Sequence, residues 1–562
     1  MERRSASPLL SWEQASVHMS ALLTAGMGLV NLLSAVTPSM RSRLRLLEEY
    51  SPLQVSHGGH LTSALAGFAL FLLAANLWRR KRVAWLLTVL VLGASVVVHL
   101  LKGLDYEEAA LAATLLALLL VWRSHFHARS DPPSIRQAFS TLLAALAFTM
   151  VYGVLGFYLL DRHFRVSFGF WAAVRQTIVM FTQYYDPGLE PITGFGRYFA
   201  DSIYVVAMLT TGYALLLLIR PVLTRHRASP EERALAAEIV QTYGHTSLAR
   251  LALLDDKHYY FSAGGSVAAY VVKGRVALVL GDPIGPKSDA ADCIKGFKNY
   301  CSTNDWLPAF YQVLPDYLKL YLNAGFRSIQ IGQEGIVDLP SFTLEGGQRK
   351  NIRTSVNKMK RLGYFAEALN APHPSTVLQE LGDVSNEWLS SRNTSEMRFS
   401  VGWFDLDYLN TCPVLIVRNE EQKIVAFANV LVEFQADEIS VDMMRHRANA
   451  EKGTMDFLFA ALIGWARDQG YSRFSFGLSA LSGIGIHPKD PVVERALRYV
   501  FEHVKQFYNF KGLHDYKDKF GPVWLPRYLM LPTMASLPAV ASGLIRANTG
   551  DDLLGGYVFH PR

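Results

Sequence analysis

Hydrophobic residues are concentrated in the first 220 positions of this 562-residue chain, in runs of roughly the length that crosses a bilayer. Six such runs occur, at about 14–36, 60–78, 83–101, 108–122, 138–160 and 202–219. A further apolar stretch at 170–183 is interpreted as a re-entrant or interfacial helix. The pattern therefore predicts a transmembrane domain of about six helices over residues 1–220.

The loops between these runs differ in charge, and the difference predicts their orientation. The basic run at 79–82 (RRKR) is the strongest signal, because Lys and Arg accumulate on the cytoplasmic side of a membrane. Counted alternately from that loop, the chain after Arg220 emerges into the cytoplasm. No cleavable signal peptide is apparent, because the first run is too long and lacks a small-residue cleavage site.

Beyond residue 220 the apolar pattern changes to short strands interleaved with helices. A polar linker at 221–240 contains a helix start at Ser229 and Pro230. The pattern then predicts strands at 259–262, 266–272, 276–280, 307–313 and 328–332, with helices at 289–304 and 315–324. This order indicates an α/β unit, the first subdomain, over 241–345.

A second unit of similar order follows a basic connecting helix at 346–370. Its predicted parts are a helix at 376–390, strands at 413–418 and 424–434, and a strand, loop, helix and strand over 438–477. Two units of similar order imply a tandem repeat of one fold, although no residue-level identity between them is apparent. The second subdomain covers 371–545, and a C-terminal tail covers 546–562.

The turn at Gly453 and Thr454 is the clearest candidate ligand site in the second unit. A Gly between strand and helix lets the backbone approach a ligand, and the free N–H groups of the first helical turn favour an anion. The turn therefore predicts a phosphate or carbonyl cradle. The alternative is the ordinary turn that any strand–helix–strand unit needs.

Two further segments carry charge. The run 349–361 (RKNIRTSVNKMKR) holds six basic residues and no acid, and helical spacing places Arg349, Arg353, Val356 and Lys360 on one face. Such a helix can follow phosphates of RNA or lipid, or carry solvated charge only.

Residues 507–529 interleave aromatic side chains with cations. This composition suits either the binding of an RNA end or the packing of a terminal helix.

Composition adds two constraints. The net charge of +7 suits an anionic partner, either a lipid surface or nucleic acid. The three cysteines have no CxxC spacing, so neither a disulfide framework nor a zinc site is indicated.

Several of these segments together resemble one family. The resemblance is carried by GDPIG at 281–285, by the basic run at 349–361, by VDMMRHRANAEKGTMDFLF at 441–459 and by FYNFKGLHDYKDKFGPVWLPRYL at 507–529. HLLKGLDYEEA at 99–109 extends it into the membrane part. These segments resemble the phosphatidylglycerol lysyltransferases, also called multiple peptide resistance factors, and their alanyl-transferring relatives.

The resemblance implies a multi-pass helical membrane domain in the bacterial inner membrane, followed by a cytoplasmic α/β domain of two tandem GNAT-like acyltransferase folds. It implies transfer of a lysyl or alanyl group from aminoacyl-tRNA to the glycerol headgroup of phosphatidylglycerol. That reaction lowers the negative charge of the membrane and gives resistance to cationic antimicrobial peptides. The turn at 449–454 lacks the RxxGxG/A pattern, so acyl-CoA is not expected as donor.

The implied reaction needs a base, oxyanion donors and cations for two phosphate-bearing substrates, and no redox cofactor or metal. Asp442, Arg445 and Asp456 are the candidates for the base and for orienting the substrates, although Asp442 is equally explained as a capping or ion-paired residue. The candidate substrate-binding residues are Lys511, Lys517, Arg353, Asn357, Lys358, Asp282, Gly453 and Thr454.

Several questions stay open on the sequence alone. The acceptor is phosphatidylglycerol or another membrane molecule, and a lipid translocase with a regulatory GNAT-like domain is a third interpretation. An acidic pocket would favour lysine over alanine, but the sequence does not place Glu433, Asp437 or Glu438 in space. Homo-oligomerisation is equally open.

Overall fold

The computed structural model describes residues 12–36, 66–103 apart from 68 and 72, 106–126, 169–182, 228–347, 349–392, 395–434, 438–485 and 510–550, with a few isolated positions besides. The chain divides into two compact units. One comprises residues 1–223 with 302–305, and the other comprises 224–301 with 306–562.

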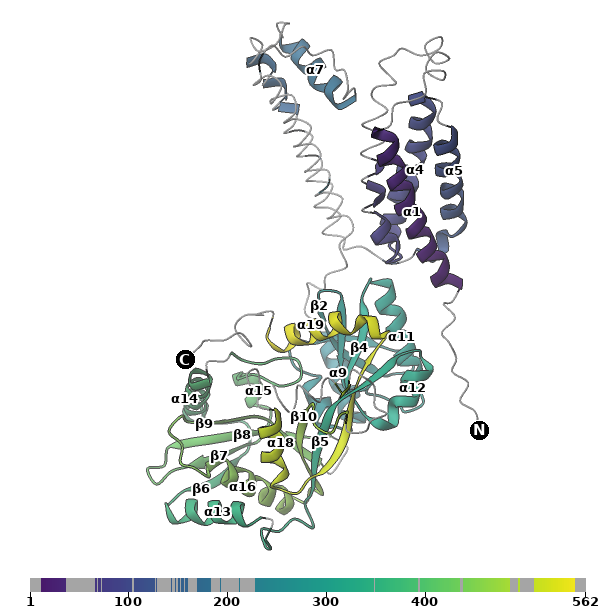
Figure 1. The fold of residues 1–562 in the computed structure, drawn as a ribbon. Helices are drawn as coiled ribbons and strands as arrows, with labels where there is room; N and C mark the ends of the chain where they lie inside the picture. The colour runs from purple at the N-terminus through teal and green to yellow at the C-terminus, as the bar shows by residue number, and fades with distance from the viewer. Residues whose placement is uncertain are drawn as a thin grey trace, which may run out of the picture. The chain divides into compact units, whose positions relative to one another are not determined.

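The N-terminal unit is helical. Its elements include α1 (Trp12–Val36), α4 (Arg82–Gly103), α5 (Tyr106–Val121), η1 (Arg123–His125) and α7 (Phe170–Thr182) (Figure 1). Buried apolar side chains from α1, α4 and α5, such as Val17, Leu92 and Leu115, form one core cluster. The predicted helices at 14–36, 83–101, 108–122 and 170–183 are confirmed as helices. Of the run at 60–78, the described positions between 66 and 77 are helical. The runs at 138–160 and 202–219 lie largely outside the described residues.

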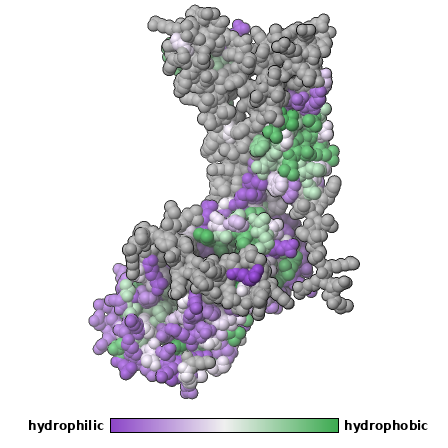
Figure 2. All heavy atoms as spheres, viewed as in Figure 1, coloured by the Kyte–Doolittle hydropathy of each residue, from purple (hydrophilic) through white to green (hydrophobic). Residues whose placement is uncertain are grey.

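The helices of this unit also carry apolar residues on their outer faces. Leu22, Leu90 and Leu111 are more than half exposed, and Figure 2 shows hydrophobic residues over much of the coloured surface of this unit. Among the described residues, no helix combines the length and the hydropathy needed to span a membrane.

The described residues of the C-terminal unit form an eleven-stranded sheet in the order β1-β2-β3-β4-β11-β5-β10-β9-β8-β7-β6 (Figure 1). The strands are β1 (His258–Phe261), β2 (Val267–Lys273), β3 (Val276–Leu280), β4 (Leu307–Val313), β5 (Arg327–Asp338), β6 (Phe365–Leu369), β7 (Val414–Arg418), β8 (Ile424–Val432), β9 (Glu438–His446), β10 (Arg473–Ala480) and β11 (Val523–Leu531).

The same strand order occurs twice in this sheet. In the first half, the parallel pair β3 and β4 is joined through α11 (Ala290–Thr303); in the second half, β9 and β10 are joined through α16 (Thr454–Asp468). The last strand of each half is exchanged, because β11 pairs with β4 and β5 pairs with β10. The two halves therefore share the centre of one sheet.

Helices cover both faces of the second half. α16 and α13 (Lys350–Arg361) lie over one face, where Val356, Ile439 and Phe459 belong to one core, and α14 (Ser375–Arg392) contacts β8 and β9 on the other. The remaining elements are α9 (Pro230–Tyr243), α10 (Ser247–Leu251), η3 (Pro315–Tyr317), α12 (Leu318–Asn323), α15 (Leu406–Leu409), α18 (Phe510–Asp518), η4 (Met534–Ser536) and α19 (Leu537–Asn548). The predicted cap at Ser229 is confirmed, since its side chain accepts from Glu232 N–H in a capping box.

Three predictions about elements need correction. Val356, assigned to the basic face of its helix, is buried with Ile352 and Met359, because these three residues form the apolar stripe that faces α16. The strand predicted at 328–332 continues to Asp338 as β5. β6 and β11 were not predicted as strands.

Candidate functional site

The parallel pair β9 and β10 separates part-way along its length. The two strands pair at Arg473 with Glu438, Phe474 with Ile439 and Ser475 with Ser440. No pairing continues beyond these residues, although β9 runs on to His446 and β10 to Ala480. The register between β10 and β5 also shifts between Ser475 and Leu478. Backbone groups of β10 after Ser475 are therefore left without a partner on β9.

A buried lysine from α18 contacts those backbone groups. Lys517 Nζ donates to the carbonyl oxygens of Leu478 at 3.0 Å and Gly477 at 3.4 Å. Burial lowers the pKa of Lys517 to about 8, because the ammonium form is poorly solvated there. This predicted substrate-binding residue thus lies at the point where the sheet opens, and its amine loses its proton more readily than an exposed lysine.

Buried carboxyl groups surround the same region. Glu334 of β5 forms a buried ion pair with Arg527 of β11 and accepts a hydrogen bond from the hydroxyl of Ser475. Glu433 and Glu438, at the adjoining ends of β8 and β9, are also buried, and burial raises the pKa of both carboxyls. The structure thereby places two of the three acids that the sequence left unplaced, whereas Asp437 lies outside the described residues.

Asp442 lies on β9 at an irregularity of the ladder. Between the pairs Ala428–Met444 and Val430–Val441, β9 contains one residue more than β8, so an additional residue is accommodated near Asp442. Its carboxylate accepts from Gly402 N–H at 2.8 and 2.9 Å and from the Tyr408 hydroxyl at 2.7 Å. Burial raises the pKa of Asp442. Both oxygens are therefore already hydrogen-bonded.

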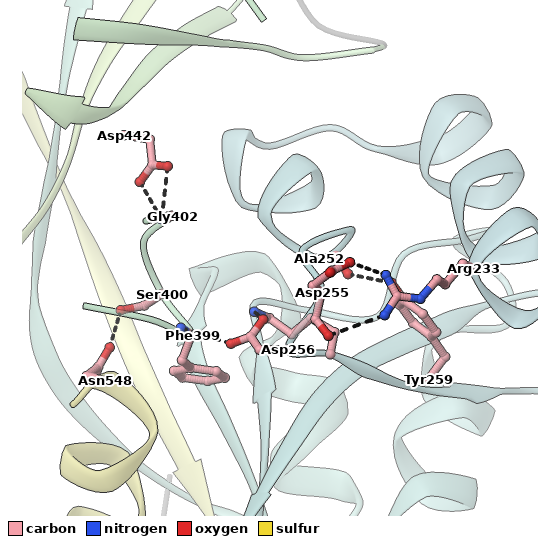
Figure 3. Close-up of polar contacts among 11 residues, drawn as sticks. Arg233, Ala252, Asp255, Asp256, Tyr259, Phe399, Ser400, Gly402, Asp442 and Asn548 are labelled. Atoms are coloured by element: carbon pink, nitrogen blue, oxygen red, sulfur yellow. Dashed lines mark hydrogen bonds and ion pairs between the residues drawn. The ribbon is translucent and has the colours of Figure 1, made fainter. Parts of the chain in front are cut away.

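The partner of Asp442 belongs to a segment at 396–404 that is held at several points, some of them drawn in Figure 3. Phe399 N–H donates to Asp256 at 3.1 Å, and the Ser400 hydroxyl donates to Asn548 at 2.8 Å. Asp256 itself pairs with buried Lys257 at 2.5 Å. Asp442 therefore holds the segment 396–404 of the second half in place. The same segment is hydrogen-bonded to Asp256 of the first half and to Asn548 of α19.

Arg445 holds the beginning of the same segment. Its guanidinium donates to both carboxylate oxygens of Glu396, at 2.8 and 2.6 Å, and also to the Ser385 hydroxyl. It lies over the ring of Trp388, 5.5 Å from the centroid. The side chain is buried and forms a bidentate ion pair.

The predicted cradle at Gly453 and Thr454 faces helix α13. Gly453 has φ of +103°, and a Cβ built on it would lie 3.0 Å from Ser355. The Ser355 hydroxyl donates to Asp456 at 2.9 Å. Asp456 therefore contacts α13, the helix that covers the face of the sheet carrying Ile439. The structure does not bring Asp456 together with Asp442. Thr454 is buried.

The other predicted residues fall in three places. On α13, Arg353 donates to the carbonyl oxygens of Leu344 and Gly346. Lys358, on the same helix, forms an ion pair with Glu451 at 2.5 Å, and Asn357 is exposed. Asp282 is buried in the first half; it accepts from Leu314 N–H and the Tyr321 hydroxyl, and burial raises its pKa to about 7. Lys511 is exposed on α18.

Most of the C-terminal unit matches a known protein family. Residues 237–531, just over half of the chain, match the family model for the C-terminal part of phosphatidylglycerol lysyltransferase. The chain belongs to the phosphatidylglycerol lysyltransferase family. The family resemblance inferred from the sequence is therefore confirmed. Residues 13–163 match a second model, described as the transmembrane region of lysyl-tRNA synthetase; the number of spans stays a prediction.

Relatives in the phosphatidylglycerol lysyltransferase family are longer than this chain. The phosphatidylglycerol lysyltransferase of Bacillus subtilis is 29% identical over 477 residues, which are 84% of this chain and 53% of that protein. The one from Staphylococcus haemolyticus is 32% identical over 396 residues, which are 70% of this chain and 45% of that protein. The chain spans about half the length of these relatives.

Two solved structures resemble the C-terminal unit. L-PGS from Bacillus licheniformis is 34% identical, covers 58% of this chain and 98% of its own, and has a TM-score of 0.51. A C-terminal domain (DUF2156) from Agrobacterium fabrum is 34% identical, covers 57% and 98%, and has a TM-score of 0.52. The lysyltransferase-family member described here thus combines an N-terminal helical region with a C-terminal α/β domain.

The main groups at the opening of the sheet were not singled out by sequence reasoning. Glu334, Arg527, Tyr408 and Glu396 each make a contact that holds the site. Arg527 was noted only as a cation of the segment 507–529, and the other three were not named. A signal existed for Glu334, because it is a charged residue within the apolar pattern of a strand. No local signal marks Glu396, whose partner Arg445 is 49 residues away.

Gly453 provides a local test of the α13–α16 contact. Replacement by alanine is expected to destabilise the C-terminal unit by about 1–3 kcal/mol, because a left-handed φ is strained for alanine and the methyl group meets Ser355. Gly464, inside the same helix with nothing near its missing side chain, is the matched control. Gly464→Ala should stabilise by about 0.5–1 kcal/mol. Thermal unfolding of both variants measures the two changes in stability. Equal changes would contradict the described contact between Gly453 and Ser355.

Proposed function

We propose that the chain transfers a lysyl group from lysyl-tRNA to phosphatidylglycerol at the opening between β9 and β10. The observation that carries this proposal is that the family match at 237–531 covers the opening together with its buried ionisable groups. The reaction would lower the negative charge of a bacterial inner membrane and give resistance to cationic antimicrobial peptides. The helical region would hold the C-terminal unit at the cytoplasmic face of the bilayer.

The proposed fold and boundaries follow from the repeated strand order. The first GNAT-like subdomain would cover 241–345 and the second 371–545, joined by the basic segment at 346–370, with the linker at 221–240 following the membrane domain. The exchange of β5 and β11 supports a tandem pair that shares one sheet. The catalytic centre would belong to the second subdomain, where β9 and β10 separate.

The chemistry is the exchange of one ester for another. The terminal hydroxyl oxygen of the lipid glycerol attacks the carbonyl carbon of the lysyl ester; the new C–O bond forms and the bond to the tRNA ribose oxygen breaks. The proton of the lipid hydroxyl is transferred to the departing ribose oxygen. A buried amine with a pKa of about 8 is partly neutral near pH 7, so Lys517 is the proposed proton-transfer group. The exposed Lys511 and the basic α13 would attract the RNA and lipid phosphates.

Asp442 is proposed as a positioning residue, because its two oxygens are committed to Gly402 and Tyr408. Replacement by alanine removes these bonds and is expected to lower the transfer rate on the order of a hundredfold, the scale associated with misplaced site groups. Arg445 is likewise proposed as a positioning residue, because its guanidinium holds Glu396. Asp456 would support the α13 contact.

The test uses the full-length chain with tRNA charged with labelled lysine and vesicles that contain phosphatidylglycerol. Labelled phosphatidylglycerol should appear in the lipid extract, should require intact tRNA, and should decline strongly with Asp442→Ala. Asp468→Ala, which removes an exposed carboxylate at the end of α16, is the control and should leave the rate unchanged. Melting of each variant separates loss of fold from loss of rate.

Other results would identify other functions. Label in a different lipid or in a peptidoglycan precursor would indicate another acceptor. Absence of any labelled product with the wild-type chain would contradict the transferase proposal. If Asp442→Ala instead alters the leaflet distribution of lipids while their composition is constant, the translocase interpretation gains support.

A further inference from the structure

Two buried carboxyl groups lie at the ends of β8 and β9, and their only ion pair in the described part of the chain joins Glu438 to the half-exposed Arg473. Val432 pairs with Ile439, so the next residues outward, Glu433 and Glu438, lie opposite each other. Each is only 7% exposed. Their carboxyl groups lie within hydrogen-bonding reach of each other, which requires that one of them carries a proton.

Glu433 is the less satisfied of the two. In the described part of the chain, neither of its carboxyl oxygens has a hydrogen-bond donor apart from the protonated form of Glu438. Glu438 has a cation 3.5 Å away in Arg473, whose side chain is half exposed. Arg527 is already paired with Glu334, and Lys517 donates to backbone carbonyls. A buried carboxylate without a cation is costly, so the pair is a site where a cation would be stabilised.

The pair also lies in line with the proposed reaction centre. Glu438, Ser440 and Asp442 alternate along β9 with Ile439 and Val441, which point into the α13–α16 core. Glu438 and Ser440 therefore share the opposite face of the strand, and Asp442 follows them at the irregularity of the ladder. Pairing between β9 and β10 ends at Ser440, and two strand residues span about 7 Å, the scale of an extended lysine side chain.

We propose that Glu433 and Glu438 bind the side-chain ammonium of the lysyl group, so that they select a cationic aminoacyl donor over a neutral one. The inference rests on the proposed function of the site. The ammonium would replace the shared proton and donate to the free oxygens of Glu433. An alanyl group is too short to reach the pair and would leave the shared proton in place. Among the described residues, no group of three or more His, Cys, Asp or Glu side chains is arranged to hold a metal ion.

The experiment compares two donors that share one tRNA. The full-length chain is given lysyl-tRNA or the same tRNA carrying Nε-acetyl-lysine, which keeps the side-chain length and removes the charge. The wild-type chain should prefer the lysyl donor. Glu433→Gln and Glu438→Gln should each reduce that preference roughly ten- to a hundredfold, the range for hydrogen bonds to a charged group. The loss should fall on the lysyl donor, with the acetyl-lysyl rate maintained.

Glu421→Gln is the matched control, since Glu421 is an exposed acid in the turn between β7 and β8. It should leave the donor preference unchanged. If both buried-site variants melt as the wild type does and retain the full preference for the lysyl donor, the proposal is overturned. If the wild-type chain produces no labelled lipid from either donor, the proposed function fails, and a binding measurement then tests the pair by itself.

That measurement uses amino acid esters in place of tRNA. Lysine ethyl ester should raise the melting temperature of the full-length wild-type chain more than norleucine ethyl ester does, because only the former carries the ammonium. Glu433→Gln should remove the difference. Equal shifts from the two esters in the wild-type chain would contradict an ammonium site.

Discussion

Replacing Arg527 by alanine is expected to destabilise the C-terminal unit by about 3–5 kcal/mol, a large fraction of the stability of an ordinary domain. Arg527 and Glu334 are both buried and form an ion pair between β11 and β5 in the middle of the sheet. Without the guanidinium, Glu334 stays buried near Glu433 and Glu438, so three carboxyl groups would share the remaining cations. Thermal or urea unfolding of the full-length chain measures the effect.

Two further variants show whether the loss comes from an uncompensated charge. The double variant Arg527→Met with Glu334→Gln removes both charges and should recover more than half of the lost stability, because a neutral pair leaves no buried ion. Arg467→Ala, at an exposed ion pair with Asp468 on α16, should change the stability by less than about 0.5 kcal/mol. A double variant no more stable than Arg527→Ala alone would contradict the explanation.

Replacing Arg445 by alanine is expected to destabilise the fold by about 3 kcal/mol and to lower the transfer rate on the order of a hundredfold. The guanidinium binds Glu396 through two hydrogen bonds, and Glu396 in turn accepts from Phe404 N–H. Its loss frees the segment that also holds Gly402 against Asp442. Labelled-lipid formation and thermal unfolding are measured on the same preparation.

The pattern of effects distinguishes a supporting role from a substrate contact. Arg445→Lys should recover only part of the rate, because an ammonium cannot reproduce the planar two-point contact with a carboxylate. Glu396→Gln should resemble Arg445→Ala in both readouts if the two residues act as one pair. If Arg445→Ala lost transfer while melting as the wild type does, and Glu396→Gln had no effect, Arg445 would contact substrate directly.

Much of the fold could be predicted because apolar periodicity is a local property. The fully buried strand Val276–Leu280 and the strand Leu307–Val313 were predicted with the bounds observed. β11 was missed because its sequence carries Pro526 and Arg527 among aromatics, and its strand form depends on two neighbours distant in sequence. β6 was missed because its five residues are all half-buried and show no alternation.

The site was less predictable, because residue type indicates chemistry but not contact. Asp442 and Asp456 lie near each other in the sequence, yet β9 and α16 place them against different partners, Gly402 and Ser355. Arg349 was placed on the basic face of a helix that could follow phosphates or carry solvated charge, but its guanidinium donates to the carbonyl oxygens of Thr343 and Phe520. Long-range pairs such as Glu334 with Arg527 depend on strand order, which the local pattern does not contain.

The exchange of β5 and β11 has a consequence for how the protein is made. β11 contributes Leu529 and Leu531 to the core that also contains Val271 and Leu280 of the first half. A ribosome begins β11 about 185 residues after it finishes β5, which corresponds to roughly 10–40 s of synthesis. During that interval the nascent first half has strand edges at β4 and β5 without their central partner, and such edges invite pairing with other chains. A premature stop anywhere before Val523 would make that exposure permanent, so truncated products should aggregate instead of persisting as a folded first half.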